Sequence, residues 1–286
     1  MKEQNQDTRY KIQDKRHSFL GSRFLALAPY LTLILGSCLL LGSTTFSLIS
    51  SYETKATVLT VDNFSNFYTS ADNRLFKFSP DGAFLYPYEE NKYGKIGMVD
   101  ATNTMKILVF YPDLLTVVTL DKFLSPLSTY SFFDLGYQNV SAVASSLDGR
   151  LWFFDNTEFK LKKIDETGQV FRESQPLNLL TNAVPNPNFI TEKDNTVYVN
   201  DPNIGIMVFD GFGSYGKTIP LKGLKKFQVF QDQIIYFDNN KLNAFNLTTL
   251  DLRSLTLPDS TDVIMAAIQK DRIGILKKDR VDFYRY

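Results

Sequence analysis

A strand-and-turn pattern recurs six times along the chain and restricts it to a repeat architecture. In each repeat an alternating apolar segment ends in one bulky residue, usually followed by Asp, Asn or Ser. Successive bulky residues are 42, 44, 45, 36 and 38 positions apart, close to the period of a four-stranded propeller blade, about 40–50 residues. These markers are Phe78, Leu120, Ile164, Phe209, Phe245 and Phe283.

A second marker strand supports the same register. It lies eight to eleven residues before each bulky residue, and turn-forming residues separate the two strands. The 234 residues after Tyr52 give 39 for each of six repeats. We therefore predict an all-β fold, a six-bladed β-propeller of residues 53–286 preceded by an N-terminal membrane-targeting helix. The second markers are Tyr68, Phe110, Phe153, Tyr198, Tyr236 and Ile275.

The last repeat ends at Tyr286, directly after its third strand. A propeller closes most simply when one blade takes strands from both ends of the chain, because this leaves no open sheet edge. Residues 54–61, TKATVLTV, are the predicted closing strand of the last blade. The alternative is that they form the innermost strand of the first blade.

The N-terminal region predicts attachment to a membrane. Residues 1–23 carry six basic and three acidic side chains, and residues 24–52 carry no charge. About 20 apolar residues suffice to cross a bilayer. Because basic flanks stay in the cytoplasm, we expect residues 1–23 to be a cytoplasmic tail, and residues 53–286 to lie on the periplasmic or extracellular side.

Three fates remain open for residues 24–52. They can form an uncleaved transmembrane anchor, or a signal segment that is simply removed. The third fate rests on Cys38, which ends a Leu-Gly-Ser-Cys sequence that resembles a bacterial lipobox, so it is a candidate lipidation site. Three leucines follow Cys38 and favour the uncleaved anchor.

Composition excludes several kinds of chemistry. The chain has one histidine, His17, and one cysteine, Cys38, and both precede residue 53. Serine-histidine hydrolysis, cysteine-histidine catalysis, histidine-bound zinc and disulfide scaffolds all need more of these residues. Residues 24–286 hold 25 basic and 28 acidic side chains. A slightly acidic domain has no positive electrostatic potential to attract nucleic-acid phosphates, so we expect no nucleic-acid partner.

Two conspicuous features have structural explanations. Residues 211–216 read G-x-G-x-x-G, but a strand-like segment ending in Pro220 follows instead of the helix that a dinucleotide site requires. We interpret them as a hairpin turn. Trp152, the only tryptophan, is expected to fill the space between blades.

The repeats resemble the six-bladed propellers of the NHL and TolB-like kind. They are also similar to a group of small membrane-attached propeller proteins of Bacteroidota that have no assigned activity. The resemblance covers the body but not the first 52 residues, and implies a fold without catalytic residues. The motifs that carry it are residues 148–152 (DGRLW), 197–202 (VYVNDP), 208–210 (VFD) and 217–220 (KTIP).

The same resemblance suggests one enzymatic alternative. Some related six-bladed propellers hold a divalent ion at the channel mouth and hydrolyse lactones or sugar esters. Calcium or another hard cation needs several converging oxygens. Asp62, Asp100 and Glu192 are the candidate ligands, because each is in or beside a predicted innermost strand. Ordinary solvated turn acids are the simpler interpretation, under which the protein has no cofactor.

The expected function is protein binding or scaffolding in the cell envelope, without catalysis. The predicted partners are other envelope proteins, and residues 24–52 are expected to attach the protein to the membrane. A metal-dependent, lactonase-like hydrolase and a small-ligand sensor remain alternatives. Apolar residues in the connection of the second repeat are the predicted contact patch, namely Phe123, Leu124, Tyr130, Phe132 and Phe133.

Overall fold

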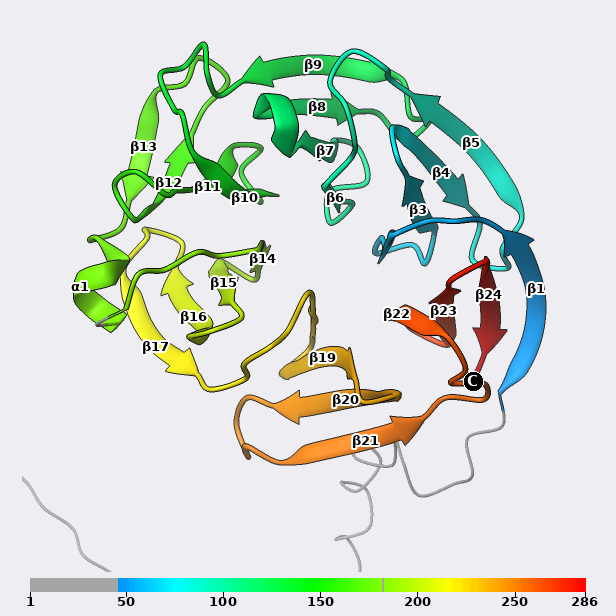
Figure 1. Cartoon of the computed structure of the whole chain (residues 1–286). Coiled ribbons are helices and arrows are strands. Elements are labelled where there is room, and N and C mark those ends of the chain that lie inside the picture. The colour runs from blue at the N-terminus through cyan, green and yellow to red at the C-terminus, as the bar shows by residue number, and fades with distance from the viewer. Residues whose placement is uncertain (1–45, 182) are drawn as a thin grey trace, which may run out of the picture. The chain divides into compact units, whose positions relative to one another are not determined.

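Six antiparallel sheets surround a common centre as the blades of a propeller (Figure 1). The computed structural model describes residues 46–181 and 183–286. The expected tail and most of the expected membrane segment lie outside the described residues. Within each blade the strands follow one another from the centre to the rim, and the outermost strands run along the circumference (Figure 1). The all-β, six-bladed fold predicted from the repeats is therefore confirmed.

The blades are given from the innermost strand outward. The first three are β2 (Val58–Val61), β3 (Phe67–Ala71), β4 (Arg74–Phe78) and β5 (Phe84–Glu89); β6 (Met98–Asp100), β7 (Ile107–Tyr111), β8 (Thr116–Leu120) and β9 (Pro126–Ser131); and β10 (Val140–Ser145), β11 (Leu151–Asp155), β12 (Lys160–Ile164) and β13 (Val170–Glu173). The last three are β14 (Phe189–Lys193), β15 (Thr196–Asp201), β16 (Gly205–Asp210) and β17 (Tyr215–Ile219); β18 (Gln228–Phe230), β19 (Gln233–Asp238), β20 (Lys241–Asn246) and β21 (Leu252–Thr256); and β22 (Val263–Gln269), β23 (Arg272–Lys277), β24 (Arg280–Arg285) and β1 (Ser47–Glu53). A 3₁₀ turn, Pro112–Leu114, joins β7 to β8, and α1 (Leu177–Thr181) precedes β14.

Both sequence markers have a structural cause. The bulky residues lie on the third strand of every blade, and the second markers lie on the second strand. These two strands are enclosed by neighbouring blades, so they bury most of their side chains. The buried aromatic residues fill the space between blades, as expected for Trp152, which is fully buried beside Phe153 and Phe154.

The polar residue after the third strand builds the turn to the outermost strand. Asp121 accepts hydrogen bonds through Oδ1 from the backbone N–H groups of Phe123 and Ser125, both at 2.8 Å. Asp210 bonds the N–H groups of Phe212 and Ser214 in the same way, at 2.9 Å. Asp and Asn side chains stabilise turns by such bonds to their own backbone. Residues 211–214 thus form a hairpin turn, as predicted, and Tyr215 and Gly216 already belong to β17.

The ring is closed by β1, which forms the outermost strand of the last blade. It pairs antiparallel with β24, from Ser47 opposite Arg285 to Glu53 opposite Arg280. Side chains reinforce the pairing, because Ser51 Oγ donates to Asp282 Oδ1 at 2.7 Å. Closure from both ends of the chain was predicted, but the prediction that residues 54–61 supply the closing strand was wrong.

The closing strand was missed because it reads SLISSYE, which is mostly polar and exposed. An outermost strand buries little, so it needs no apolar alternation. Residues 54–61 instead contain β2, Val58–Val61, whose alternation suits the innermost strand of the first blade. That was the stated alternative.

The propeller consequently begins before residue 53. Ser47 starts β1, so the last residues of the expected 24–52 membrane segment belong to a blade. The expected membrane-targeting helix would fall on residues outside the described part. Across residues 46–181 and 183–286, no helix has the length and apolar character needed to span a bilayer.

Substitution at Gly82 tests the closure. Gly82 lies in the turn between β4 and β5 with φ +79°, and a Cβ there would overlap Ser50 Oγ and the Phe283 ring. Gly149 has φ +83° and open space around it. Both alanine variants carry the strain of a left-handed backbone conformation. Gly82→Ala also overpacks its surroundings, which typically costs a further 1–3 kcal/mol, roughly, in the free energy of unfolding. Gly82→Ala should therefore lower the free energy of unfolding by that much more than Gly149→Ala.

The measurement is urea unfolding of the detergent-solubilised chain, followed by the fluorescence of Trp152. Equal losses for the two variants would show that β1 and β24 do not pack against this turn.

Candidate functional site

Asp62 holds a turn together. It follows β2, and its carboxylate accepts hydrogen bonds from the backbone N–H groups of Phe64 and Asn66 at 2.8 and 2.9 Å. The Asn66 amide and the Tyr68 hydroxyl also donate to it, at 2.8 and 3.0 Å. The burial of Tyr68 and the nearby Asp62 charge raise the pKa of that phenol far above its usual range. Asp62 is therefore a structural acceptor between the first two strands of its blade.

Asp100 and Glu192 join neighbouring blades. Asp100 accepts from Thr102 and, across the blade boundary, from the Ser145 backbone N–H at 2.8 Å. Glu192 accepts from Trp152 Nε1 at 2.7 Å. Such bonds satisfy buried polar groups that would otherwise destabilise the core.

The three acids therefore do not form a metal centre. In the part of the chain that the structure describes, no group of three or more His, Cys, Asp or Glu side chains could hold a metal ion. Each acid instead accepts hydrogen bonds of its own: Asp62 within a turn, and Asp100 and Glu192 from the neighbouring blade.

The five residues of the expected contact patch lie in different environments. Phe132 is fully buried and packs 4.8 Å from Phe153 between ring centroids, and Leu124 is buried as well. The prediction that these two residues form a contact surface was wrong. Phe123 and Phe133 are exposed, but they lie before and after β9, at its opposite ends.

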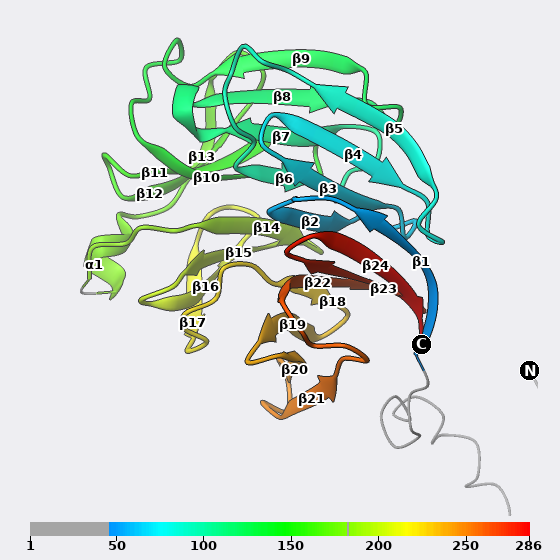
Figure 2. The ribbon, with the colours of Figure 1, turned by 45° about the vertical axis from the view of Figure 1, so that its right-hand side comes forward.

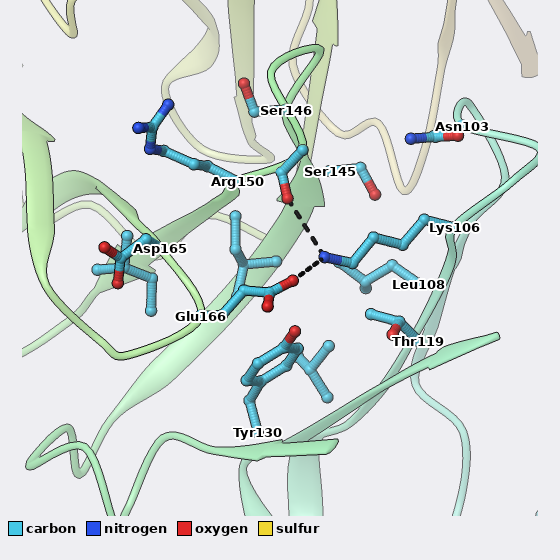
Figure 3. A pocket seen from close by; sticks show the side chains of 14 residues that line it. Asn103, Lys106, Leu108, Thr119, Tyr130, Ser145, Ser146, Arg150, Asp165 and Glu166 are labelled. Carbon is cyan, nitrogen blue, oxygen red and sulfur yellow. Dashed lines mark hydrogen bonds and ion pairs between the residues drawn. The ribbon is translucent and has the colours of Figure 1, made fainter. Parts of the chain in front are cut away.

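The error came from interpreting residues 123–133 as a long connection. They contain β9, the outermost strand of the second blade, together with the turns that flank it. Tyr130 lies on β9, is half-buried, and lines a small cavity of about 30 Å³ between the second and third blades (Figure 3).

That small cavity is closed by an ion pair. Lys106 Nζ lies 2.8 Å from Glu166 Oε1 and 3.3 Å from the Gly149 carbonyl oxygen (Figure 3). Burial lowers the pKa of Lys106, but Glu166 and Tyr130 outweigh it and raise that pKa above its usual value. Because about 30 Å³ holds little more than one water, the pair serves to join blades.

A larger groove of about 590 Å³ lies at the other side of the second blade. The 3₁₀ turn Pro112–Leu114, the start of β8 and the end of β9 form it. Leu114 is 53% exposed and Phe133 is 67% exposed, and Tyr93 also lines the groove. The charged side chains at this groove are Lys92, Asp113 and Asp134.

A third cavity, of about 270 Å³, lies among the fifth, sixth and first blades and contains Lys226. Lys226 Nζ donates to the Leu59 carbonyl oxygen at 3.2 Å and lies 5.6 Å from the Phe189 ring centroid. Lys226 pairs with no acidic side chain within the described residues. Burial lowers its pKa to about 8, against the opposing effect of Asp100. An ammonium in this position can bind a small anion.

Sequence reasoning missed both larger sites. The groove combines residues from three connections and two strands, which only the folding of the second blade brings together. Lys226 left a weaker signal, since it belongs to a short run that also contains Lys222 and Lys225, directly before β18.

Comparisons with known proteins agree with this architecture. A catalytically inactive virginiamycin B lyase from Staphylococcus aureus, altered from histidine to alanine and solved with quinupristin, is 14% identical, with a TM-score of 0.57 over 85% of this chain and 100% of that chain. A chain of a mitotic checkpoint complex is 10% identical, with a TM-score of 0.61 over 84% and 94% of the two chains. The Pan2 WD40 domain of Neurospora crassa is 9% identical, with a TM-score of 0.53 over 84% and 95%.

These likenesses establish the fold alone. The chain has the fold of a six-bladed β-propeller. No protein family matches its sequence, and no curated protein matches it significantly.

Proposed function

We propose that this propeller is a non-catalytic protein-binding module, tethered to the membrane and facing away from the cytoplasm. The observation that carries this proposal is the groove beside Phe133, where Phe133 and Leu114 are exposed although the blades do not need them for packing. Large exposed side chains that folding does not require mark interaction sites. The proposed occupants are extracytoplasmic segments of other envelope proteins.

The lining of the groove suits a peptide segment better than a small metabolite. Apolar Leu114 and Phe133 can contribute contact area, and Tyr93 adds an aromatic surface with a polar end. Lys92 and Asp113 can fix the register of a partner by charge. Aromatic anchors surrounded by polar side chains are the usual arrangement of a binding hot spot.

The proposed tether is the uncharged run that ends where the propeller begins. Residues 24–45 number 22 and carry no charge. As a helix they would extend about 33 Å, enough for the apolar core of a bilayer. If Cys38 is lipidated instead, eight residues, 39–46, separate the lipid from β1. The mass of the mature chain distinguishes these anchors.

Crosslinking in native membranes tests the groove. Phe133→Ser should reduce the recovery of crosslinked partner at least about tenfold, because the loss of an aromatic anchor commonly weakens binding by more than 1.4 kcal/mol. Leu179→Ser is the matched control, since Leu179 is equally exposed on α1, outside the groove. Point substitution is preferable to deletion of residues 123–133, which would remove β9.

The recovered proteins are identified by mass spectrometry, and folding is checked by the fluorescence of Trp152. Unchanged recovery with Phe133→Ser, in a folded protein, would contradict the proposal. A loss of the same size with Leu179→Ser would show that the groove is not the specific contact.

A second candidate function, small-ligand sensing, is favoured by Lys226 alone. We propose that the cavity of about 270 Å³ takes a small carboxylate or phosphate, paired with the Lys226 ammonium. A ligand that binds only the folded state raises its stability, and roughly 2–4 °C in Tm accompanies each kcal/mol in a domain of this size.

Inorganic phosphate and succinate are the probes for this second candidate. Each should raise the Tm of the wild-type protein and of Lys222→Met, whose side chain is exposed and lies outside the cavity, and leave the Tm of Lys226→Met unchanged. Equal shifts in all three proteins would contradict a site at Lys226. The expected pH dependence follows from the pKa of about 8, because Lys226 loses its charge above that pH.

A further inference from the structure

The turns of the six blades divide between two faces of the disc. Because strands alternate in direction, the turn after each innermost strand and the turn after each third strand lie on the same face. Hydrogen bonds between neighbouring blades agree, since Asn63 Nδ2 donates to the Thr102 carbonyl at 3.1 Å and Lys106 Nζ to the Gly149 carbonyl at 3.3 Å. We call this the tip face.

Large apolar side chains are exposed at the tips of these turns. Their exposed fractions run from 50% to 68%. Turn tips ordinarily carry Gly, Asn, Asp, Ser or Pro, so folding gives no reason for such side chains. The six residues are Phe64, Met105, Phe123, Leu147, Phe212 and Leu250.

Four of the six occupy one position in the turn. Each lies two residues after an Asp or Asn, and its backbone N–H donates to that side chain at 2.8–3.0 Å. Only the backbone takes part in this bond, so any non-proline residue could stand there. Phe123 packs edge-to-face on Tyr86, with 5.5 Å between ring centroids, and the Arg172 guanidinium lies 5.5 Å from the Phe212 ring centroid, yet all four side chains stay at least half exposed. The four pairs are Asp62 with Phe64, Asn103 with Met105, Asp121 with Phe123, and Asp210 with Phe212.

The chain also reaches the propeller at the tip face. The start of β1 pairs with the end of β24, a third strand, and lies beside the C-terminus (Figures 1 and 2). Ser50 Oγ donates to the Asp81 carbonyl at 2.8 Å, in the tip-face turn of the first blade. Leu48 is itself 55% exposed. The uncharged residues 24–45 therefore end next to this face.

We infer that the tip face lies on the phospholipid bilayer that holds residues 24–45, with the six apolar tips inserted at headgroup depth. This inference rests on the proposed tether. With Ser47 already in a strand, there is no spacer to hold the propeller away from a membrane-spanning anchor. Apolar side chains on a protein surface enter the boundary between headgroups and acyl chains by about 5–10 Å.

This orientation leaves the groove free for partners. Leu114 lies in the turn between β7 and β8, and Phe133 follows β9, so both belong to the face opposite the tips. The two sets of exposed apolar residues thus have different occupants. Lipid covers the tips, and the groove points into the extracytoplasmic space.

Lipid-quenching fluorescence tests the orientation. Single-cysteine variants Phe64→Cys and Phe212→Cys, in a Cys38→Ser background of the full chain, are labelled with bimane and reconstituted into phospholipid vesicles. The vesicles carry nitroxide on the acyl chain near the headgroup. Leu179→Cys and Leu114→Cys are the matched controls, because they are exposed on the opposite face. Only propellers outside the vesicles are scored, as the part of the signal that external protease removes.

Both tip labels should be quenched at least about twofold more than the controls, since only groups at acyl depth meet the nitroxide. The difference should persist at high salt, because apolar insertion is not screened. Equal quenching at tips and controls, in a protein that floats with the vesicles, overturns the orientation and leaves the tether standing. A folded full chain that does not float with the vesicles overturns both.

Discussion

The pairing of β1 with β24 is the constraint on which the rest of the structure depends. The six blades are separate four-stranded sheets, and the blade at which the two chain ends meet is complete only when it takes strands from both. Here the closing strand is contributed by Ser47–Glu53, with Ser51 bonded to Asp282 and Phe46 packed 6.3 Å from the Tyr284 ring centroid. Closure fixes the register of all six repeats and determines where the N-terminal segment meets the disc.

The turn chemistry then gives each face a different character. Asp and Asn side chains after the strands satisfy the turn backbone, so the hydrogen bonds of the turn do not depend on which side chain stands at the tip. Two of the acids that first suggested a cation site also have structural hydrogen bonds, because Asp100 accepts from the Ser145 backbone of the next blade and Glu192 accepts from Trp152. The remaining exposed apolar residues carry the proposals for lipid and protein contact.

The blades could be predicted from the sequence, because enclosed second and third strands must alternate apolar residues with the period of the repeat. Of the outermost strands, β17 was recognised from the strand-like segment that ends in Pro220, but β1 and β9 were not, since they bury little and carry no such signal. This is why the closing strand was sought among residues 54–61, and why Phe132, which is buried in the turn after β9, was expected on a contact surface. The groove depends on how the turns of the second blade pack beside its strands, and the Lys226 cavity depends on which blades become neighbours in space; a strand pattern encodes neither.

Hydrogen exchange of the full chain tests the ring closure most directly. If β1 completes the last blade, amides of Ser47–Glu53 that pair with β24 must exchange slowly and lose protection together with Arg280–Arg285, because one ladder of hydrogen bonds holds both. The contradicting result is exchange of Ser47–Glu53 at the rate of an unstructured peptide while β23 and β24 stay protected. In that case the ring would be closed in another way.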